Sequence, residues 1–509
     1  MTNSEGNSRC LDAFTIALSQ ACEKGEKRWY ASTLELQLAS LEFCRACRSV
    51  PTLRVSIFDE TPRSLWSPPE GQTGHNTASS RTRVSSRVPL VRAFHLTWVL
   101  PMEVLLESAA DELWALTELL GVCGTVSAGS LSTVDWPKGL KQLVLAPRGA
   151  LSIDQVRWPA SLRKLQLGGV FDQSIDGVVW PISLQQLLFG GRFNQPIAGV
   201  VWPPSLQTLS FGYRFNQSVA GAVWPTSLRK LSFGDKFNRP ISRSVWPASL
   251  EQLSFDWDFN QPVAGVVWPT MLQHLSFGYM FNQPIASVVW PTALQQLRFG
   301  KRFNQSVATA VWPTSLQQLS FETFNQPIAG VVWPASLQRL SFGRHFNRPI
   351  DGVVWPISLQ TISFGETFNQ PIAGVVWPAS LPKLSFGRNF DQPIDGVVWP
   401  VSLQTLSFGE KFNQPIAGAV WPPSLRKLSF GRNFDQPIAG IVWPFSLQTL
   451  VFGEKFNQPI IGVVWPSSLR KLSFGRSFDQ SIAGIVWPAN LQQLRRFGKR
   501  FNESVATVV

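Results

Sequence analysis

Cysteine is scarce in this sequence and is confined to its beginning. The five cysteines are Cys10, Cys22, Cys44, Cys47 and Cys123, and residues 131–509 contain none. An odd number of cysteines, absent from most of the chain, is typical of a protein from a reducing compartment. We therefore expect an intracellular, cytoplasmic protein. Cys44 and Cys47 form a lone CxxC pair, which we interpret as ordinary thiols because one close pair is weak support for a zinc site.

Long apolar runs are also missing. The most apolar segment, residues 88–106, contains Arg92, His95 and Glu103. A transmembrane helix needs about 18 or more apolar residues with few charges, and no segment meets this condition. The first residues, MTNSEGNSRCLDAF, lack the basic and apolar segments of a secretory signal. We expect no membrane partner.

The sequence lacks the groups of residues that carry catalysis. Its four histidines, His75, His95, His274 and His345, are scattered. It contains no glycine-rich phosphate loop, no HExxH motif and no pair of carboxylates set apart from the general pattern. Catalysis needs a unique site, whereas most of this sequence repeats itself. We predict no enzyme activity, no catalytic residue, no cofactor and no metal.

The sequence contains instead a repeat of 22 residues. Tryptophan occurs 22 times, and 17 of these tryptophans precede a proline, from Trp136 to Trp487. Successive Trp-Pro pairs are 22 residues apart, except that 21 residues separate Trp312 from Trp333. A fixed period of this length predicts a solenoid rather than a series of globular domains.

One unit, residues 202–223, has the sequence WPPSLQTLSFGYRFNQSVAGAV. Its LxxLxF spacing predicts a short strand with the apolar side chains inward. The residues that we expect in the core are Leu206, Leu209, Phe211, Phe215, Val219 and Val223. Two proline sites and two glycines per unit leave no space for a helix of two turns. We predict a mainly β fold, a β-solenoid of about 17 coils that stack at roughly 4.8 Å.

The motif FNQPI, followed by WPxSLxxLxFG, resembles the FNIP repeat, a 22-residue relative of the leucine-rich repeat. The resemblance covers about three quarters of the chain. It implies a leucine-rich-repeat-like solenoid, a class commonly used for protein-protein interaction. Tryptophan stands where that family usually has an aliphatic residue before the proline. Asn216 lies ten positions after Leu206 rather than eight, which argues against the asparagine ladder of ordinary leucine-rich repeats.

The chain before the repeats is organised differently. Apolar spacing predicts two helices within residues 10–48, and an amphipathic helix from Pro101 to Leu120 that would cap the first coil. The predicted domains are a helical N-terminal region (1–60), a flexible linker rich in Ser, Pro, Thr, Gly and Arg (61–90), a capping-helix region (91–130) and the repeat solenoid (131–509).

Two residues recur for structural reasons. An asparagine follows the inward phenylalanine in most units, and Asp172, Asp391, Asp435 and Asp479 replace it in four. Asparagine and aspartate share an acceptor oxygen, so we expect them to accept hydrogen bonds from backbone N–H groups of the turn. Each tryptophan of a Trp-Pro pair follows a valine in nearly all units, which favours packing in the core or at a corner over base stacking.

The units differ most at the two residues between FG and FN. The first of the two alternates in charge in the later units, through Arg344, Glu366, Arg388, Glu410, Arg432, Glu454 and Arg476. This half of the array therefore repeats in pairs of units, every 44 residues. Opposite charges on stacked neighbours stabilise one register, so we interpret this column as structural.

The same column carries aromatic residues in earlier units. Both tyrosines of the array, and its only tryptophan outside a Trp-Pro pair, fall there within four units. Aromatic residues flanked by charges at the end of a strand have the composition of a protein-binding hot spot. The candidate partner-binding residues are Tyr213, Arg214, Lys236, Trp257, Tyr279, Met280, Lys301 and Arg302.

The charge of the chain indicates the partner. Residues 1–130 contain 12 basic and 14 acidic side chains, and residues 131–509 contain 33 and 18. We predict a non-enzymatic scaffold whose outer columns bind a protein with an acidic surface. Nucleic acid is an alternative partner that the positive charge supports, although lysine and arginine follow no stripe of one per unit.

The ends of the chain suggest two further interpretations. Residues 100–105, LPMEVL, resemble the opening of an F-box, which implies an adaptor that brings substrates to a ubiquitin ligase. No capping segment follows the last unit before Val509. An unpaired apolar edge strand tends to pair with another chain, so we expect either self-association through the C-terminal coil or a truncated product.

Overall fold

The computed structural model describes residues 131–132, 134–147 and 152–495, and the backbone of three strands that precede them. The chain divides into two compact units. The first comprises Met1–Gln195 and Val200–Gly212, and the second comprises Pro196–Gly199 and Tyr213–Val509. The described residues form strands and turns only, and they include no helix that is long and apolar enough to span a membrane.

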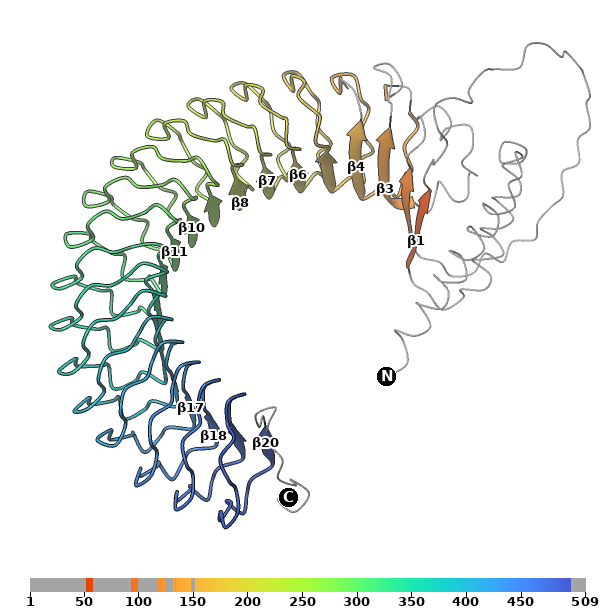
Figure 1. The fold of residues 1–509 in the computed structure, drawn as a ribbon. Helices are drawn as coiled ribbons and strands as arrows, with labels where there is room; N and C mark the ends of the chain where they lie inside the picture. The colour runs from red at the N-terminus through yellow and green to blue at the C-terminus, as the bar shows by residue number, and fades with distance from the viewer. Residues whose placement is uncertain are drawn as a thin grey trace, which may run out of the picture. The chain divides into compact units, whose positions relative to one another are not determined.

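Twenty strands form the described structure (Figure 1). They are β1 (Thr52–Ile57), β2 (Ala93–Trp98), β3 (Thr117–Gly124), β4 (Gln142–Pro147), β5 (Lys164–Leu167), β6 (Gln186–Leu188), β7 (Thr208–Ser210), β8 (Lys230–Ser232), β9 (Gln252–Ser254), β10 (His274–Ser276), β11 (Gln296–Arg298), β12 (Gln318–Ser320), β13 (Arg339–Ser341), β14 (Thr361–Ser363), β15 (Lys383–Ser385), β16 (Thr405–Ser407), β17 (Lys427–Ser429), β18 (Thr449–Val451), β19 (Lys471–Ser473) and β20 (Gln493–Arg495). From β4 onward each coil contributes one strand, which confirms a mainly β solenoid of about 17 coils.

Each strand pairs in parallel with the strand of the next coil. This holds from β1 to β7 in the first unit and from β8 to β20 in the second. Equivalent residues of successive repeats face one another, as Leu253 and Leu275 do. Within the second unit, the strands line the concave side of a curve and the turns lie on its outer side (Figure 1). One sheet therefore continues through each unit.

The region before the repeats contains three strands where we predicted helical structure. β1 falls inside the region expected to be helical, and β2 and β3 fall inside the region of the predicted capping helix. The helix predicted to run to Leu120 is wrong over its last residues, because β3 begins at Thr117 and pairs with β4. Residues 10–48, 61–90 and 100–105, and the chain after Arg495, lie outside the described residues, so the predictions made there stay predictions.

The core of each coil is built from leucine and phenylalanine. The leucines at the two LxxL positions are at most 2% exposed along the array from Leu162 to Leu472. Phe386 stacks on Phe390 of its own coil at a centroid distance of 4.2 Å, and on Phe408 of the next coil at 5.8 Å. Within each unit, successive coils that carry phenylalanine place their rings on those of their neighbours, so the core of each unit continues from coil to coil.

The tryptophans of the Trp-Pro pairs close this core, as predicted. Fifteen of the seventeen are buried, and Trp158 and Trp487 are half-buried. Trp399 meets the ring of Phe408 edge to face, with centroids 6.3 Å apart and planes at 78°. Edge-to-face contact is a favoured geometry for aromatic pairs. The indoles thus form the corner of the coil and leave no tryptophan face open for base stacking at these positions.

The valine before each tryptophan does not belong to the core, which corrects one expectation. Val219 is buried, whereas Val223, which we placed in the core, is 72% exposed. In another unit Val267 is 79% exposed, although both of its neighbours, Val266 and Trp268, are buried. The backbone is extended here, so successive side chains alternate between inside and outside. One valine per coil therefore points to solvent.

The asparagines of successive coils form a hydrogen-bonded ladder. This corrects the expectation, drawn from the position of Asn216 within its repeat, that such a ladder is absent. The N–H of Asn260 donates to Oδ1 of Asn238 at 3.0 Å, and the N–H of Asn413 donates to Oδ1 of Asp391 at 2.9 Å. The prediction of a shared acceptor is confirmed, because aspartate serves in the same way. The glutamine that follows adds a second donor, as Gln261 Nε2 does to Asn238 Oδ1 at 2.9 Å.

Loss of the acceptor at Asn347 is expected to destabilise the array. Asn347→Asp is expected to leave it nearly unchanged, because the neighbouring ladder residues, Asn325 and Asn369, are uncharged. Oδ1 of Asn347 accepts the N–H of Asn369 at 2.9 Å and Nε2 of Gln370 at 3.0 Å. Asn347→Leu removes both bonds and leaves partly buried donors unsatisfied, which costs about 1–3 kcal/mol. Urea unfolding of both variants measures the difference, and equal losses of stability would contradict the role of the acceptor.

Candidate protein-binding surface

The eight candidate residues occupy one kind of turn in the second unit. They lie at the two positions between the strand and the inward phenylalanine, in coils that carry Tyr213, Asp235, Trp257, Tyr279 and Lys301. Backbone hydrogen bonds hold these turns in a stack. The N–H of Asp258 donates to the carbonyl of Asp235 at 2.7 Å, and the N–H of Met280 to that of Trp257 at 2.8 Å. The turns are therefore supported by their neighbours on both sides.

Trp257 and Tyr279 stack on each other at the surface. Their ring centroids are 4.1 Å apart and their planes differ by 7°. Trp257 is 48% exposed, so this indole, unlike those of the Trp-Pro pairs, offers much of its surface to solvent. Stacking fixes the two rings in one orientation before any partner arrives, which lowers the entropic cost of binding.

Two lysines lie over the aromatic rings. Nζ of Lys236 is 5.6 Å from the ring centre of Tyr213, and Nζ of Lys301 is 5.2 Å from that of Tyr279. Both distances are within the range of cation-π attraction. Tyr213 is itself 50% exposed. The cluster therefore presents half-open rings with an ammonium group beside each end.

Lys236 also forms an ion pair with Asp258. Nζ lies 3.0 Å from Oδ2, with both side chains partly exposed. The hydrogen bond and the charge of Asp258, followed by the charge of Tyr213, raise the pKa of Lys236 above its ordinary value. Because Asp258 adjoins Trp257 in the chain, this pair connects the tyrosine at one end of the cluster with the stacked rings at the other.

The structure adds one residue that the sequence analysis did not single out. Asp256 takes the place that glycine occupies in most coils, next to Trp257. Burial, and then the charge and hydrogen bond of Asp235, raise the pKa of the Asp256 carboxyl. The missing glycine of the FG pair was the available signal. Asp256 is exposed by surface area, and the nearby carboxylate of Asp235 disfavours its charged form.

The structure thus brings together five of the eight candidates: Tyr213, Lys236, Trp257, Tyr279 and Lys301. We call these five residues the aromatic cluster. Arg214, Met280 and Arg302 lie in the same turns, but among the described residues their side chains form no ion pair or ring contact with the cluster. Arg214 and Arg302 are exposed, and Met280 is half-buried. They surround the cluster without being held by it.

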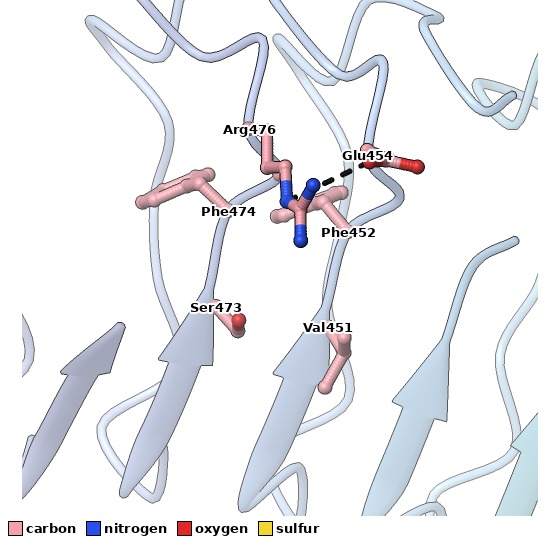
Figure 2. Close-up of a pocket in the computed structure, with 7 residues that line it drawn as sticks. Val451, Phe452, Glu454, Ser473, Phe474 and Arg476 are labelled. Carbon is pink, nitrogen blue, oxygen red and sulfur yellow. Dashed lines mark ion pairs between the residues drawn. The ribbon is translucent and has the colours of Figure 1, made fainter. Parts of the chain in front are cut away.

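The later turns of the same column carry ion pairs instead of rings. Arg344 binds Glu366 at 3.2 Å, Arg388 binds Glu410 at 2.7 Å, and Arg432 binds Glu454 at 2.7 Å. This confirms the structural interpretation of the alternating charges. A hollow of about 250 Å³ lies among these turns. Arg476 is 3.6 Å from Glu454 there, and Figure 2 shows this ion pair beside Phe452 and Phe474. The charges there satisfy one another.

Comparison with known proteins identifies the repeat. The model of the FNIP Repeat matches ten segments, the first six of them overlapping, that together extend from residue 171 to residue 500. The chain belongs to the FNIP repeat family. No curated protein matches the sequence of this FNIP repeat protein. Its repeats have the FNIP length of 22 residues, and their phenylalanine, asparagine and glutamine are the core and ladder residues described above.

The solved structures that match the FNIP repeat protein include the following two. One, "CroV588 a novel circular LRR protein", is 37% identical, with a TM-score of 0.68, over 82% of this chain and 64% of that one. The chain therefore spans less than two thirds of that protein's length. An internalin from Listeria monocytogenes is 14% identical, with a TM-score of 0.31, over 66% of this chain and 86% of that one. The first likeness confirms a leucine-rich-repeat-like solenoid, a fold commonly used as a scaffold for protein interaction.

Proposed function

We propose that this FNIP repeat protein is a non-enzymatic scaffold that binds a protein partner through the aromatic cluster. The observation that carries the proposal is the exposed Trp257–Tyr279 stack, because every other described tryptophan of the repeats is wholly or largely buried. Hot spots of protein interfaces are rich in tryptophan, tyrosine and arginine held in place before binding. The aromatic cluster supplies one tryptophan and two tyrosines, and its turns are hydrogen-bonded to one another.

The partner that we propose has an acidic surface. Arg214, Lys301 and Arg302 border the rings, and no ion pair joins them to a carboxylate among the described residues. Unpaired charges at the rim of an interface attract the opposite charge and raise the rate of association. The distribution of cysteine leads us to propose that this interaction takes place inside the cell, in the cytoplasm.

Affinity capture with the full chain tests this function. We expect Tyr213→Ala, Trp257→Ala and Tyr279→Ala together to reduce the recovery of specific partners by about 30-fold or more, since hot-spot truncations cost about 2 kcal/mol or more. Quantitative mass spectrometry compares each partner between the variant and the wild type. The same partners should be lost as salt is raised.

A matched control uses exposed apolar residues of the same coils. Val267, Val289 and Val311 are 79%, 83% and 73% exposed but belong to a different column. Their triple substitution by alanine removes exposed apolar groups from a different column and should leave the recovered partners unchanged. Equal recovery with the wild type and the aromatic variant, with both folded by circular dichroism, would show that the cluster binds no partner.

A further inference from the structure

A second positive surface lies on the strands of the later coils, well away from the aromatic cluster in the sequence. Lys383 of β15, Lys427 of β17 and Lys471 of β19 occupy one register position on alternate strands, with Thr405 and Thr449 between them. Arginine precedes the lysine in two of these strands. We call Lys383, Arg426, Lys427, Arg470 and Lys471 the basic ladder.

The strand geometry turns the basic ladder away from the core. The leucine after each lysine (Leu384, Leu428 and Leu472) is fully buried. Because side chains alternate along a strand, the lysine before that leucine faces outward, as do Ser385 and Ser429, whereas Ser473 is buried. Lys383 and Lys427 are exposed and Lys471 is half-buried, and the exposed Arg426 and Arg470 directly precede β17 and β19. The lysines therefore share the outward face of strands that line the concave side of the second unit (Figure 1), with an exposed arginine beside two of them.

This face contains no carboxylate to neutralise the ladder. At the three outward positions from β15 to β19 the other residues are glutamine, threonine, serine, Pro382 and Val451. Glu410 and Glu454, the acidic residues of the neighbouring turns, are engaged by Arg388 and Arg432. Among the described residues, no ion pair involves a member of the basic ladder. The face thus offers charges and hydrogen-bond donors that no protein group uses.

We propose that the basic ladder binds the phosphate backbone of duplex nucleic acid. Neighbouring strands are about 4.8 Å apart, so cations on alternate strands recur at about 9.6 Å. Duplex DNA carries one negative charge per about 1.7 Å of its axis, so several phosphates lie within reach of a row of cations of this length. Lysine, arginine, serine, threonine and glutamine are the side chains that contact phosphates in protein-DNA complexes.

The composition of the face argues against two other partners. A protein partner needs an aromatic or aliphatic anchor at the centre of its interface, and only Val451 and Pro382 are apolar here. Single-stranded nucleic acid is held by stacking of its bases on aromatic side chains, and this face has none. Duplex bound through phosphates needs neither feature. Because the lysines of the ladder recur only in every second coil, lysine and arginine do not form a stripe of one per unit.

The salt dependence of binding tests the proposal on the full chain. The probe is a fluorescein-labelled 20-base-pair DNA duplex of arbitrary sequence, followed by fluorescence anisotropy. Five phosphate contacts predict a slope of about −4.5 for the logarithm of the association constant against that of the salt concentration. Affinity should therefore fall by about 500-fold between 50 and 200 mM salt. A slope near zero would overturn the proposal.

Variants that copy the neighbouring coils separate the ladder from total charge. R426Q, K427T, R470Q and K471T together give β17 and β19 the residues found at Gln404, Thr405, Gln448 and Thr449, so the fold is preserved by design. The slope should shrink to about −0.9. The control removes the same charge from the turns of the aromatic cluster, through R214Q, K236Q, K301Q and R302Q, and should keep the steep slope.

Three results would overturn the inference. The two quadruple variants could lose affinity equally, which would mean that net charge rather than the ladder binds the duplex. A single-stranded probe of the same length could bind as tightly as the duplex. A poly-glutamate peptide could compete at the same concentration of charge, which would identify the face as a site for acidic protein. The inference uses other coils than the proposed function, so either can fail alone.

Discussion

Replacement of Trp377 by alanine is expected to lower the free energy of unfolding by about 3–5 kcal/mol, the usual cost of deleting a buried aromatic side chain. Trp377 is 6% exposed and touches the aromatic column on both sides. Its ring centre lies 6.2 Å from that of Phe364 and 6.4 Å from that of Phe386, edge to face in both cases. The substitution therefore opens a cavity between two coils.

The adjacent residue supplies the control. Val376 precedes Trp377 in the chain but is 81% exposed. Val376→Ala should change the free energy of unfolding by at most about 0.5 kcal/mol, as expected for a surface position. Urea unfolding measures both variants, and hydrogen exchange locates the loss. A coil contacts only its neighbours, so Trp377→Ala should speed exchange most in adjacent strands. A large loss of stability in Val376→Ala would mean that Val376, rather than Trp377, packs into the corner of the coil.

The repeat itself allowed most of the fold to be predicted. A Trp-Pro pair every 22 residues required stacked coils, and the LxxLxF spacing located each strand within a residue or two. The exchange of asparagine for aspartate at Asp391 and similar positions correctly indicated an acceptor oxygen. Repetition makes these inferences strong, because each position is tested again in every coil.

Other features depended on geometry that the sequence does not contain. Val223 follows Ala222 and precedes Trp224, and composition alone cannot decide which of these apolar residues faces outward. The asparagine ladder depends on the distance between coils rather than on the spacing within one unit. Before the repeats, the apolar residues of Thr117–Gly124 fit the end of a helix as well as a strand, and pairing with β4 decides between them.

The candidate surface was predicted in part. The aromatic residues stood out because they interrupt an otherwise regular column, but the stacking of Trp257 on Tyr279 and the position of Lys236 over Tyr213 required coordinates. The basic ladder was missed for a different reason. Its period is two coils, so a comparison of single units shows no stripe, whereas the register of β15, β17 and β19 aligns the lysines.

Two neighbouring residues of β17 face opposite sides of the sheet, so we expect the same substitution at each to change the free energy of unfolding by very different amounts. Leu428→Asp places a carboxylate at a position with no exposure, and an unpaired buried charge should cost more than about 4 kcal/mol. Lys427→Asp places the same group on the outward face, where water solvates it. We expect a change within about 0.5 kcal/mol there. Urea unfolding at pH 7 compares the two variants.

The pH dependence of the stability of Leu428→Asp gives a sharper test than its loss of stability at pH 7. Burial would raise the pKa of the new carboxyl above its unfolded value of about 3.9. The folded state then binds more protons than the unfolded state, so stability must rise relative to the wild type as the pH falls toward about 4. Lys427→Asp should show no such gain. A constant deficit for Leu428→Asp would mean that the side chain escapes to solvent, and that the alternation on which both surfaces depend does not hold in β17.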